Sequence, residues 1–270
     1  MFGDLVLTHD MMIAGLHWPV DADPADVAWK LVGVNLSDLA AKGAVPLGVL
    51  LGFMLGDDAW DLAFAGALGD ALSHYETELW GGDTVGAPSS DTPRSIGLTA
   101  IGRACHMPVP SRSGAQVGDA VWVTGTIGEA MLGFEQRRGA GEAAWLRFCR
   151  PEPRLAEGRA LAPLVTAMMD VSDGLLIDAQ RLAMASGVTI AIGSSAVPLP
   201  AATAGDAALA DRAMRWGDDY ELLFTLPDAV TAPVAATRIG TVLPVGPAVL
   251  LIDGQPADAS RPLGFQHHGE

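Results

Sequence analysis

The sequence between residues 23 and 43 most constrains how this chain can fold, because it predicts a helix whose apolar face includes a carboxylate. Asp23 suits the cap of this helix, Pro24 its first position, and Gly43 a left-handed stop. Residues that recur at three- or four-residue steps share one face; they are Val27, Leu31, Val34, Asp38 and Ala41. We therefore expect that face to be buried, with Asp38 on it.

A buried Asp38 needs a partner, because a carboxylate removed from water is costly unless it is hydrogen-bonded, ion-paired or bound to a metal. Lys30 and Ser37 fall off the apolar face of the same helix. Taken alone, Asp38 is most simply explained as a cap for a neighbouring loop. The other acidic residues of the chain decide between that explanation and a metal site.

Predicted strands and helices alternate along the chain, which indicates an α/β or α+β fold. Strands are expected at residues 5–9, 49–55, 78–80, 95–102, 120–124, 189–192, 220–225, 238–242 and 249–252. Helices are expected at residues 24–42, 60–75, 130–138, 143–150, 154–168, 175–185 and 207–215. Residues 108–113 contain two prolines and no apolar periodicity. This stretch suggests two domains, residues 1–107 and 108–270.

The composition argues against several classes of function. The chain has 270 residues, a formal net charge of −16 and a pI of about 4.5, so its surface should repel nucleic acid and anionic membranes. Its longest apolar run, residues 45–55, is too short to span a bilayer. It has no basic signal-peptide segment, and Cys105 and Cys149 lack the spacing of a metal site or disulfide framework. We expect a cytoplasmic protein with no nucleic-acid or membrane partner.

Acidic residues recur beside Gly, Ser or Thr in predicted turns and strand ends. They are Asp83, Asp170 with Asp173, and Asp218 with Asp219, together with Asp10 and Asp38. For any one of them a local Asx-turn is a sufficient explanation. Together, in a sequence without a Walker loop or a Cys/His cluster, they favour Mg²⁺ bound by carboxylates and by substrate phosphates.

Short motifs spread over nearly the whole chain carry a resemblance to a known family. They include L-T-H-D at 7–10, N-L-S-D-L-A-A at 35–41, G-G-D-T at 81–84, R-S-G-A at 112–115, S-D-G-L at 172–175 and D-Y-E-L at 219–222. In this order they resemble the thiamine-monophosphate kinase family. Its superfamily also contains aminoimidazole ribonucleotide synthetase, selenophosphate synthetase and a hydrogenase maturation factor. The last three motifs favour the thiamine-phosphate member.

The resemblance implies ATP-dependent phosphorylation of thiamine monophosphate to thiamine diphosphate, with Mg²⁺ as cofactor. It also implies a homodimer, in which an N-terminal mixed sheet pairs the subunits and a C-terminal α/β sandwich follows. The implied metal positions are Thr8, His9 through its backbone, Asp10, Asp38, Asp83, Asp170 and Asp173. The implied ATP positions are Gly82, Asp83, Arg112 and Ser172. The implied positions for thiamine monophosphate are His17, Asp218, Asp219 and Phe265.

If these positions form one metal site, Asp83, Asp170 and Asp173 should lie close to Asp10 and Asp38 in the folded chain. Arg112 should then lie at the mouth of that cluster, where a cation can meet a nucleotide phosphate.

This sequence departs from the family at its start, where a metal-binding Gly-Asp-Asp motif is missing before the first predicted strand. We therefore expect an exposed strand edge, a poorly behaved dimer and weak activity. Residues 56–60 imitate the motif, and we interpret them as a helix start capped by Asp57 or Asp58. Two alternatives remain open: a nucleotide-binding homologue without catalysis, and another ATP-dependent member of the superfamily.

Overall fold

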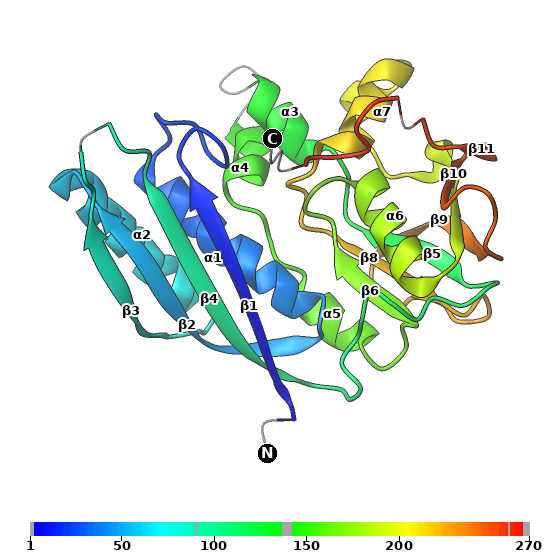
Figure 1. Cartoon of the computed structure of the whole chain (residues 1–270), viewed down its shortest axis with the longest axis horizontal. Helices are drawn as coiled ribbons and strands as arrows, with labels where there is room; N and C mark the ends of the chain where they lie inside the picture. Colours follow the sequence, from blue (N-terminus) through cyan, green and yellow to red (C-terminus); the bar gives the residue numbers. More distant parts are fainter. Residues whose placement is uncertain (1–2, 90, 137–141, 259, 267–270) are drawn as a thin grey trace.

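Two mixed sheets, one in each half of the chain, form the framework of the protein (Figure 1). The computed structural model describes residues 3–89, 91–136, 142–258 and 260–266. The predicted two-domain α/β architecture is confirmed. The exact boundary between residues 107 and 108 stays a prediction.

The N-terminal sheet has the strand order β1-β4-β2-β3, so β1 and β3 form its two edges. Its strands are β1 (Leu5–Ile13), β2 (Ala44–Leu55), β3 (Leu79–Gly86) and β4 (Ser95–Ala104). β4 pairs antiparallel with both β1 and β2, whereas β2 and β3 run parallel. Two helices, α1 (Pro24–Ala40) and α2 (Asp58–His74), pack against this sheet and share an apolar core with it.

Helix α1 begins at Pro24 as predicted and ends at Ala40, two residues before the predicted end; most of its residues are buried, rather than those on one face alone. The Asp23 carboxylate accepts from the Ala25 N–H at 2.8 Å, and Gly43 has a φ of +59°. Lys30 and Ser37, which lie off the predicted apolar face, are 2% and 0% exposed, whereas Asp38, which lies on that face, is only half-buried. The expectation was wrong because α1 lies between the two halves of the protein and contacts both (Figure 1).

Two close backbone contacts fasten α1 to the C-terminal half. A side chain at Gly33 would place its Cβ 2.6 Å from the carbonyl oxygen of Pro151. A side chain at Gly158 would place its Cβ 2.0 Å from the carbonyl oxygen of Ala40. Only glycine permits such approaches, so the spacing between α1 and the second half depends on these two residues.

The C-terminal sheet has the order β11-β10-β7-β9-β5-β8-β6. Its strands are β5 (Ala120–Thr124), β6 (Ala167–Asp170), β7 (Thr189–Ile192), β8 (Leu222–Leu226), β9 (Ala236–Leu243), β10 (Leu250–Ile252) and β11 (Gln255–Pro256). The helices of this half are α3 (Glu129–Gln136), α4 (Glu142–Cys149), α5 (Leu155–Leu161), α6 (Leu175–Ser186) and α7 (Ala207–Trp216).

Alternate residues of β8 belong to two different cores. Leu223 belongs to the large core that includes α6, whereas Leu222 and Phe224 belong to a second core with Leu161 and Ala40. The sheet is therefore covered by α6 on one face and by α5 and the end of α1 on the other.

The largest error in the predicted elements falls at residues 154–168, which were expected to form one helix. Helix α5 ends at Leu161 and β6 begins at Ala167. Pro163 explains the break, because proline lacks an N–H and its ring clashes with a continuing helix. The end of the predicted helix 130–138 lies partly outside the described residues.

The predicted start of α2 is confirmed, since the Asp57 carboxylate accepts from the Trp60 N–H at 2.9 Å. None of the helices in the described part of the chain is long and apolar enough to cross a membrane.

Candidate active site

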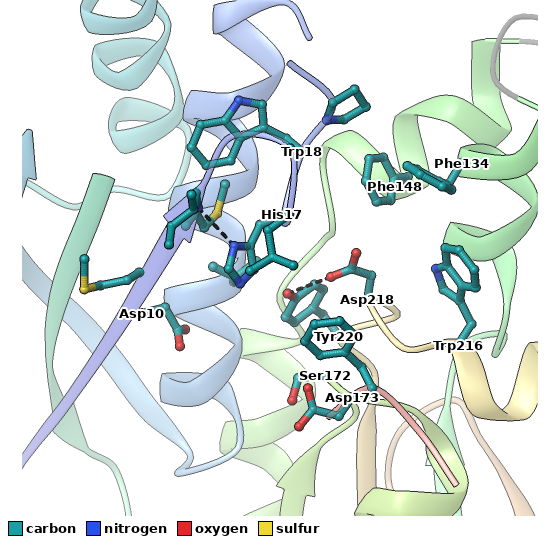
Figure 2. A pocket seen from close by; sticks show the side chains of 18 of the residues that line it. Asp10, His17, Trp18, Phe134, Phe148, Ser172, Asp173, Trp216, Asp218 and Tyr220 are labelled. Atoms are coloured by element: carbon teal, nitrogen blue, oxygen red, sulfur yellow. Dashed lines mark hydrogen bonds between the residues drawn. The ribbon is translucent and has the colours of Figure 1, made fainter. Parts of the chain in front are cut away.

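A cavity of about 980 Å³ lies between the two halves and brings most of the predicted site residues together (Figure 2). Those that line it are His9, Asp10, His17, Asp38, Asp170, Ser172, Asp173, Asp218 and Phe265. One end is acidic and the other aromatic. In Figure 2, Asp10, Ser172 and Asp173 lie away from the rings of Phe134 and Phe148.

The acidic end is built where β1, α1 and the end of β6 meet. The Ser37 hydroxyl donates to an Asp170 oxygen at 2.7 Å, and the Thr8 hydroxyl donates to Asp38. The backbone N–H of Asp10 donates to the Asn35 side-chain oxygen at 3.1 Å. Short polar side chains of α1 and β1 therefore set the positions of the carboxylates.

The carboxylates repel one another at this end of the cavity. Burial, and then the charges of Asp38 and Asp173, raise the pKa of Asp10 to about 6. Burial, and then the charge of Asp38, raise the pKa of Asp170 to about 8, against the hydrogen bond from Ser37. Both shifts show that negative charge is held here with too few cations to balance it.

This excess of carboxylate oxygen fits Mg²⁺. Among the described residues, no three His, Cys, Asp or Glu side chains stand close enough to enclose one ion by themselves. Mg²⁺ does not require such a cage, because it commonly binds one or two carboxylates and completes its shell with water and substrate phosphates. Asp10, Asp38, Asp170 and Asp173 therefore suit ions that arrive together with phosphate.

The turn that carries Ser172 and Asp173 is held by Asp178, a fully buried residue of α6. One Asp178 oxygen accepts from the Ser172 and Asp173 N–H groups at 3.1 and 3.0 Å. Arg181 pairs with the other Asp178 oxygen at 2.8 Å and also with Asp173. Burial, and then the charge of Asp173, raise the pKa of Asp178 to about 6.

A second cavity of about 460 Å³ adjoins the acidic end, and Asp38 lines both cavities. Thr8, Lys42 and the predicted nucleotide residue Arg112 also line it. Lys42 donates to the Pro110 carbonyl at 3.2 Å, and burial, followed by the charge of Arg112, lowers its pKa. Arg112 thus lines the same cavity as Asp38, and its contact with a nucleotide phosphate stays a prediction.

The aromatic end is formed by residues of α3, α4 and the end of α7. The ring centroids of Phe134 and Phe148 are 5.1 Å apart, and those of Phe134 and Trp216 are 5.4 Å apart. Tyr220 donates from its hydroxyl to Asp218 at 3.1 Å. His17 accepts from the Ile13 N–H at 3.0 Å through its Nδ1, which ties its ring to the end of β1 (Figure 2).

Asp83 and Gly82 lie elsewhere, so the expectation that Asp83 joins the cluster is wrong for a single chain. Gly82 and Asp10 occupy matching positions on β3 and β1, with β2 and β4 between them. Three strand spacings, about 14 Å, separate such positions. Gly82 instead allows close pairing with β2, since a Cβ there would lie 1.9 Å from the Leu51 carbonyl oxygen.

Asp219 does not line the cavity. It accepts from the Gly128 N–H at 2.8 Å, at the start of α3, and burial raises its pKa well above the usual range. Its side chain thus supports the backbone entering α3. Phe265, predicted on the acceptor side with Asp219, does line the cavity. His9, predicted as a metal position, also lines it, although the His9 ring itself bonds to Thr99 at 2.9 Å.

Comparison with known proteins agrees with this geometry. Residues 2–104 match the N-terminal domain of AIR synthase related protein, and residues 116–244 match the C-terminal domain. Over 238 residues the chain is 39% identical to a thiamine-monophosphate kinase of Escherichia coli, covering 83% of this chain and 71% of that protein. The chain belongs to the thiamine-monophosphate kinase family.

Two solved structures of that family superpose closely. Thiamine-monophosphate kinase from Stenotrophomonas maltophilia is 33% identical, with a TM-score of 0.83, over 94% of this chain and 86% of that chain. A structure of AaThiL complexed with AMPPCP and TMP is 30% identical, with a TM-score of 0.87, over 98% of this chain and 87% of that chain.

Several residues that line the two cavities, or that hold their lining residues in place, were not predicted from the sequence. Phe134, Phe148, Tyr220 and Lys42 line the cavities. Lys30, Ser37, Asp178 and Arg181 bond to lining residues. A usable signal existed for the lysines, because Lys30 and Lys42 are the only two in the sequence and both belong to the α1 region. Asp178 follows the S-D-G-L motif on the next helical turn, which was a second available signal.

Proposed function

We propose that this chain transfers the γ-phosphoryl group of ATP to the phosphate of thiamine monophosphate, giving thiamine diphosphate and ADP. One observation carries the proposal: a single cavity joins carboxylates from both halves of the chain to an aromatic wall. The acidic end suits phosphates accompanied by Mg²⁺, and the aromatic end suits the flat rings of thiamine.

In this proposal Mg²⁺ is held by Thr8, the backbone of His9, Asp10, Asp38, Asp170 and Asp173. The ions would neutralise the charge of two phosphate groups brought together, which is the main difficulty of this reaction. Ser37 and Thr8 keep the Asp170 and Asp38 carboxylates oriented before substrates arrive. The acceptor phosphate is already anionic, so no residue is assigned as a general base.

Arg112 and Ser172 are proposed to contact ATP, and Gly82 is proposed to do so only from the site of a second subunit. His17, Asp218, Asp219 and Phe265 are proposed on the acceptor side. The contacts of Asp218 and Asp219 within the chain make them supports of the acceptor pocket. His17 and Phe265 line the cavity directly.

We further propose a cytoplasmic homodimer in which Asp83 acts in the site of the second subunit. Asp83 is too far from Asp10 to share an ion within one chain. The sheet also exposes apolar side chains at both edges, with Leu7 64% exposed on β1 and Val85 55% exposed on β3. Such a face is typical of a surface that a second copy covers.

Coexpressing two inactive variants tests this arrangement. A mixture of Asp38→Asn and Asp83→Asn chains should recover about one quarter of normal activity, because half of the dimers are mixed and each mixed dimer has one intact site. The same variants purified separately and assayed alone should stay inactive. An absence of recovery in verified mixed dimers would place Asp83 outside the partner's site.

The activity itself is tested by incubating the purified chain with ATP, Mg²⁺ and thiamine monophosphate. We expect ADP and thiamine diphosphate in equal amounts. Parallel reactions with the aminoimidazole precursor or selenide should release no ADP above background. ATP binding without product in any of these reactions would favour the non-catalytic homologue.

A further inference from the structure

Lys30 connects three segments that form the acceptor side of the cavity, although it does not line the cavity itself. Its ammonium lies 2.9 Å from an Asp218 oxygen, 3.3 Å from the His17 carbonyl oxygen and 3.6 Å from the centre of the Phe148 ring. His17 belongs to the loop before α1, Asp218 to the turn before β8, and Phe148 to α4. Figure 2 shows these three residues facing the same space.

The charge of Lys30 is compensated by these contacts within the protein. The side chain is 3% exposed, so it has lost its water shell and depends on Asp218 for compensation. Asp218 has a second partner, because its other oxygen accepts from the Tyr220 hydroxyl at 3.1 Å. Its side chain is 29% exposed and lines the cavity, so Lys30 and Tyr220 together set the orientation in which this carboxylate meets a molecule there.

The acidic end is held by a separate set of contacts. Asp38 lies eight residues after Lys30 on α1, which corresponds to about 12 Å along the helix axis. Its partner Thr8 belongs to β1, and Ser37 bonds to Asp170 at the end of β6. Disturbing the contacts of Lys30 should therefore leave the acidic end of the cavity largely intact.

We propose that Lys30 is a positioning residue for the phosphate acceptor: it fixes His17, Asp218 and Phe148 in the arrangement that binds the flat rings of a thiamine-like molecule. This inference rests on the proposed kinase function for the identity of the acceptor. It assigns Lys30 a selective effect on acceptor binding. A residue that only stabilises the junction between the two halves would affect both substrates or neither.

The test compares Lys30→Met, which keeps the length of the side chain and removes its charge, with Arg238→Met. Arg238 lies on β9, forms an ion pair with Asp228 at 2.7 Å and does not line the cavity. Its replacement therefore controls for the loss of one paired cation. Calorimetry with thiamine monophosphate alone, and with a non-hydrolysable ATP analogue plus Mg²⁺, measures each affinity without turnover.

We expect Lys30→Met to weaken thiamine monophosphate binding about tenfold or more and to change nucleotide affinity less than about twofold. In steady state, the KM for the acceptor should rise more than kcat falls. Arg238→Met should bind both ligands like the wild type. Unchanged acceptor affinity in folded Lys30→Met, or equal losses for both ligands, overturns the inference.

If Lys30→Met does not fold, the double variant Lys30→Met with Asp218→Asn takes its place in the test, because it removes both charges of this ion pair. Its acceptor affinity should remain about tenfold below that of the wild type, and wild-type affinity overturns the inference. A wild-type chain that binds no thiamine monophosphate contradicts the proposed function, and this inference fails with it. If the wild type and Lys30→Met bind thiamine monophosphate equally tightly, only the role of Lys30 is contradicted.

Discussion

Ser37 and Asp170 are 133 residues apart in sequence, yet the Ser37 hydroxyl donates to the Asp170 carboxylate at 2.7 Å. Both are buried, at 0% and 8% exposed, and they come from the two different halves of the chain. This contact joins α1 to the end of β6 at the acidic end of the cavity. The carboxylates proposed to hold Mg²⁺ are thus brought together by the packing of the two halves.

Asp38→Asn should lower kcat/KM about a hundredfold or more at saturating Mg²⁺, because one charged oxygen is lost from the acidic cluster while the volume is kept. The melting temperature should stay the same or rise, since Asp38 contributes to the repulsion felt by Asp10 and Asp170. Asp70→Asn, on the exposed side of α2, is the matched control and should behave like the wild type. Near-normal turnover of Asp38→Asn would refute its role.

Without Mg²⁺, the protein should become less stable as the pH rises from about 5 to about 8. The folded pKa values of Asp10 and Asp170, about 6 and about 8, lie above the ordinary value of 3.8. Each group therefore favours folding while it is protonated, and this contribution disappears as the pH passes the folded pKa.

Melting curves in EDTA and in Mg²⁺ across that pH range measure the effect. Mg²⁺ should flatten the decline by neutralising the carboxylates, and Asp170→Asn should reduce the slope in EDTA. Identical slopes with and without Mg²⁺ would mean that the ion binds elsewhere.

Asp178→Asn should destabilise the protein by about 1–3 kcal/mol, because it weakens a buried acceptor for two backbone N–H groups and the ion pair with Arg181. The loosened turn should also raise the Mg²⁺ concentration needed for half-maximal activity. Urea unfolding and Mg²⁺ titrations measure the two effects. Asp206→Asn, at the start of α7, is the control because Asn caps a helix about as well as Asp.

Phe265→Ala should raise the KM for thiamine monophosphate about fivefold and leave that for ATP nearly unchanged, because a ring is lost from the acceptor side of the cavity. The backbone N–H of Phe265 donates to the Asp173 carbonyl at 2.8 Å, so the tail should stay attached. Phe265→Leu should recover part of the affinity. An increase confined to the KM for ATP would show that the acceptor pocket has been misplaced.

Local signals predicted most of the elements, and the break missed at Pro163 was itself a local signal, whereas the burial around α1 depends on tertiary packing. The caps of α1 and α2 followed from Asp23, Gly43 and Asp57, whose roles depend on neighbours in sequence. The burial of Lys30 could not follow from the pattern of α1, because a single apolar stripe describes a helix that covers one surface. Helix α1 packs against the C-terminal half as well as against its own sheet. Only the folded chain shows that Asp218, from that half, compensates the charge of Lys30.

The candidate site divides in the same way. The motifs indicated Asp10, Asp38, Asp170 and Asp173, and the fold brings these four to one cavity. Motifs carry no information about strand order, so they could not show that Asp83 lies across the sheet from Asp10. The rings of Phe134 and Phe148 had no sequence signal distinguishing them from ordinary core residues.

The close contacts of Gly33 with Pro151 and of Gly158 with Ala40 limit how this protein can move. A hinge motion would have to separate backbone atoms that already touch at two places along α1, and packed interfaces of this kind do not deform gradually. Substrate entry and product exit then fall to the parts of the cavity wall that α1 does not fasten. One such part is the segment around Phe265, which lines the cavity and is hydrogen-bonded to the Asp173 carbonyl rather than to α1. The rate of turnover would accordingly respond to the stiffness of this short segment while the body of the molecule stays still.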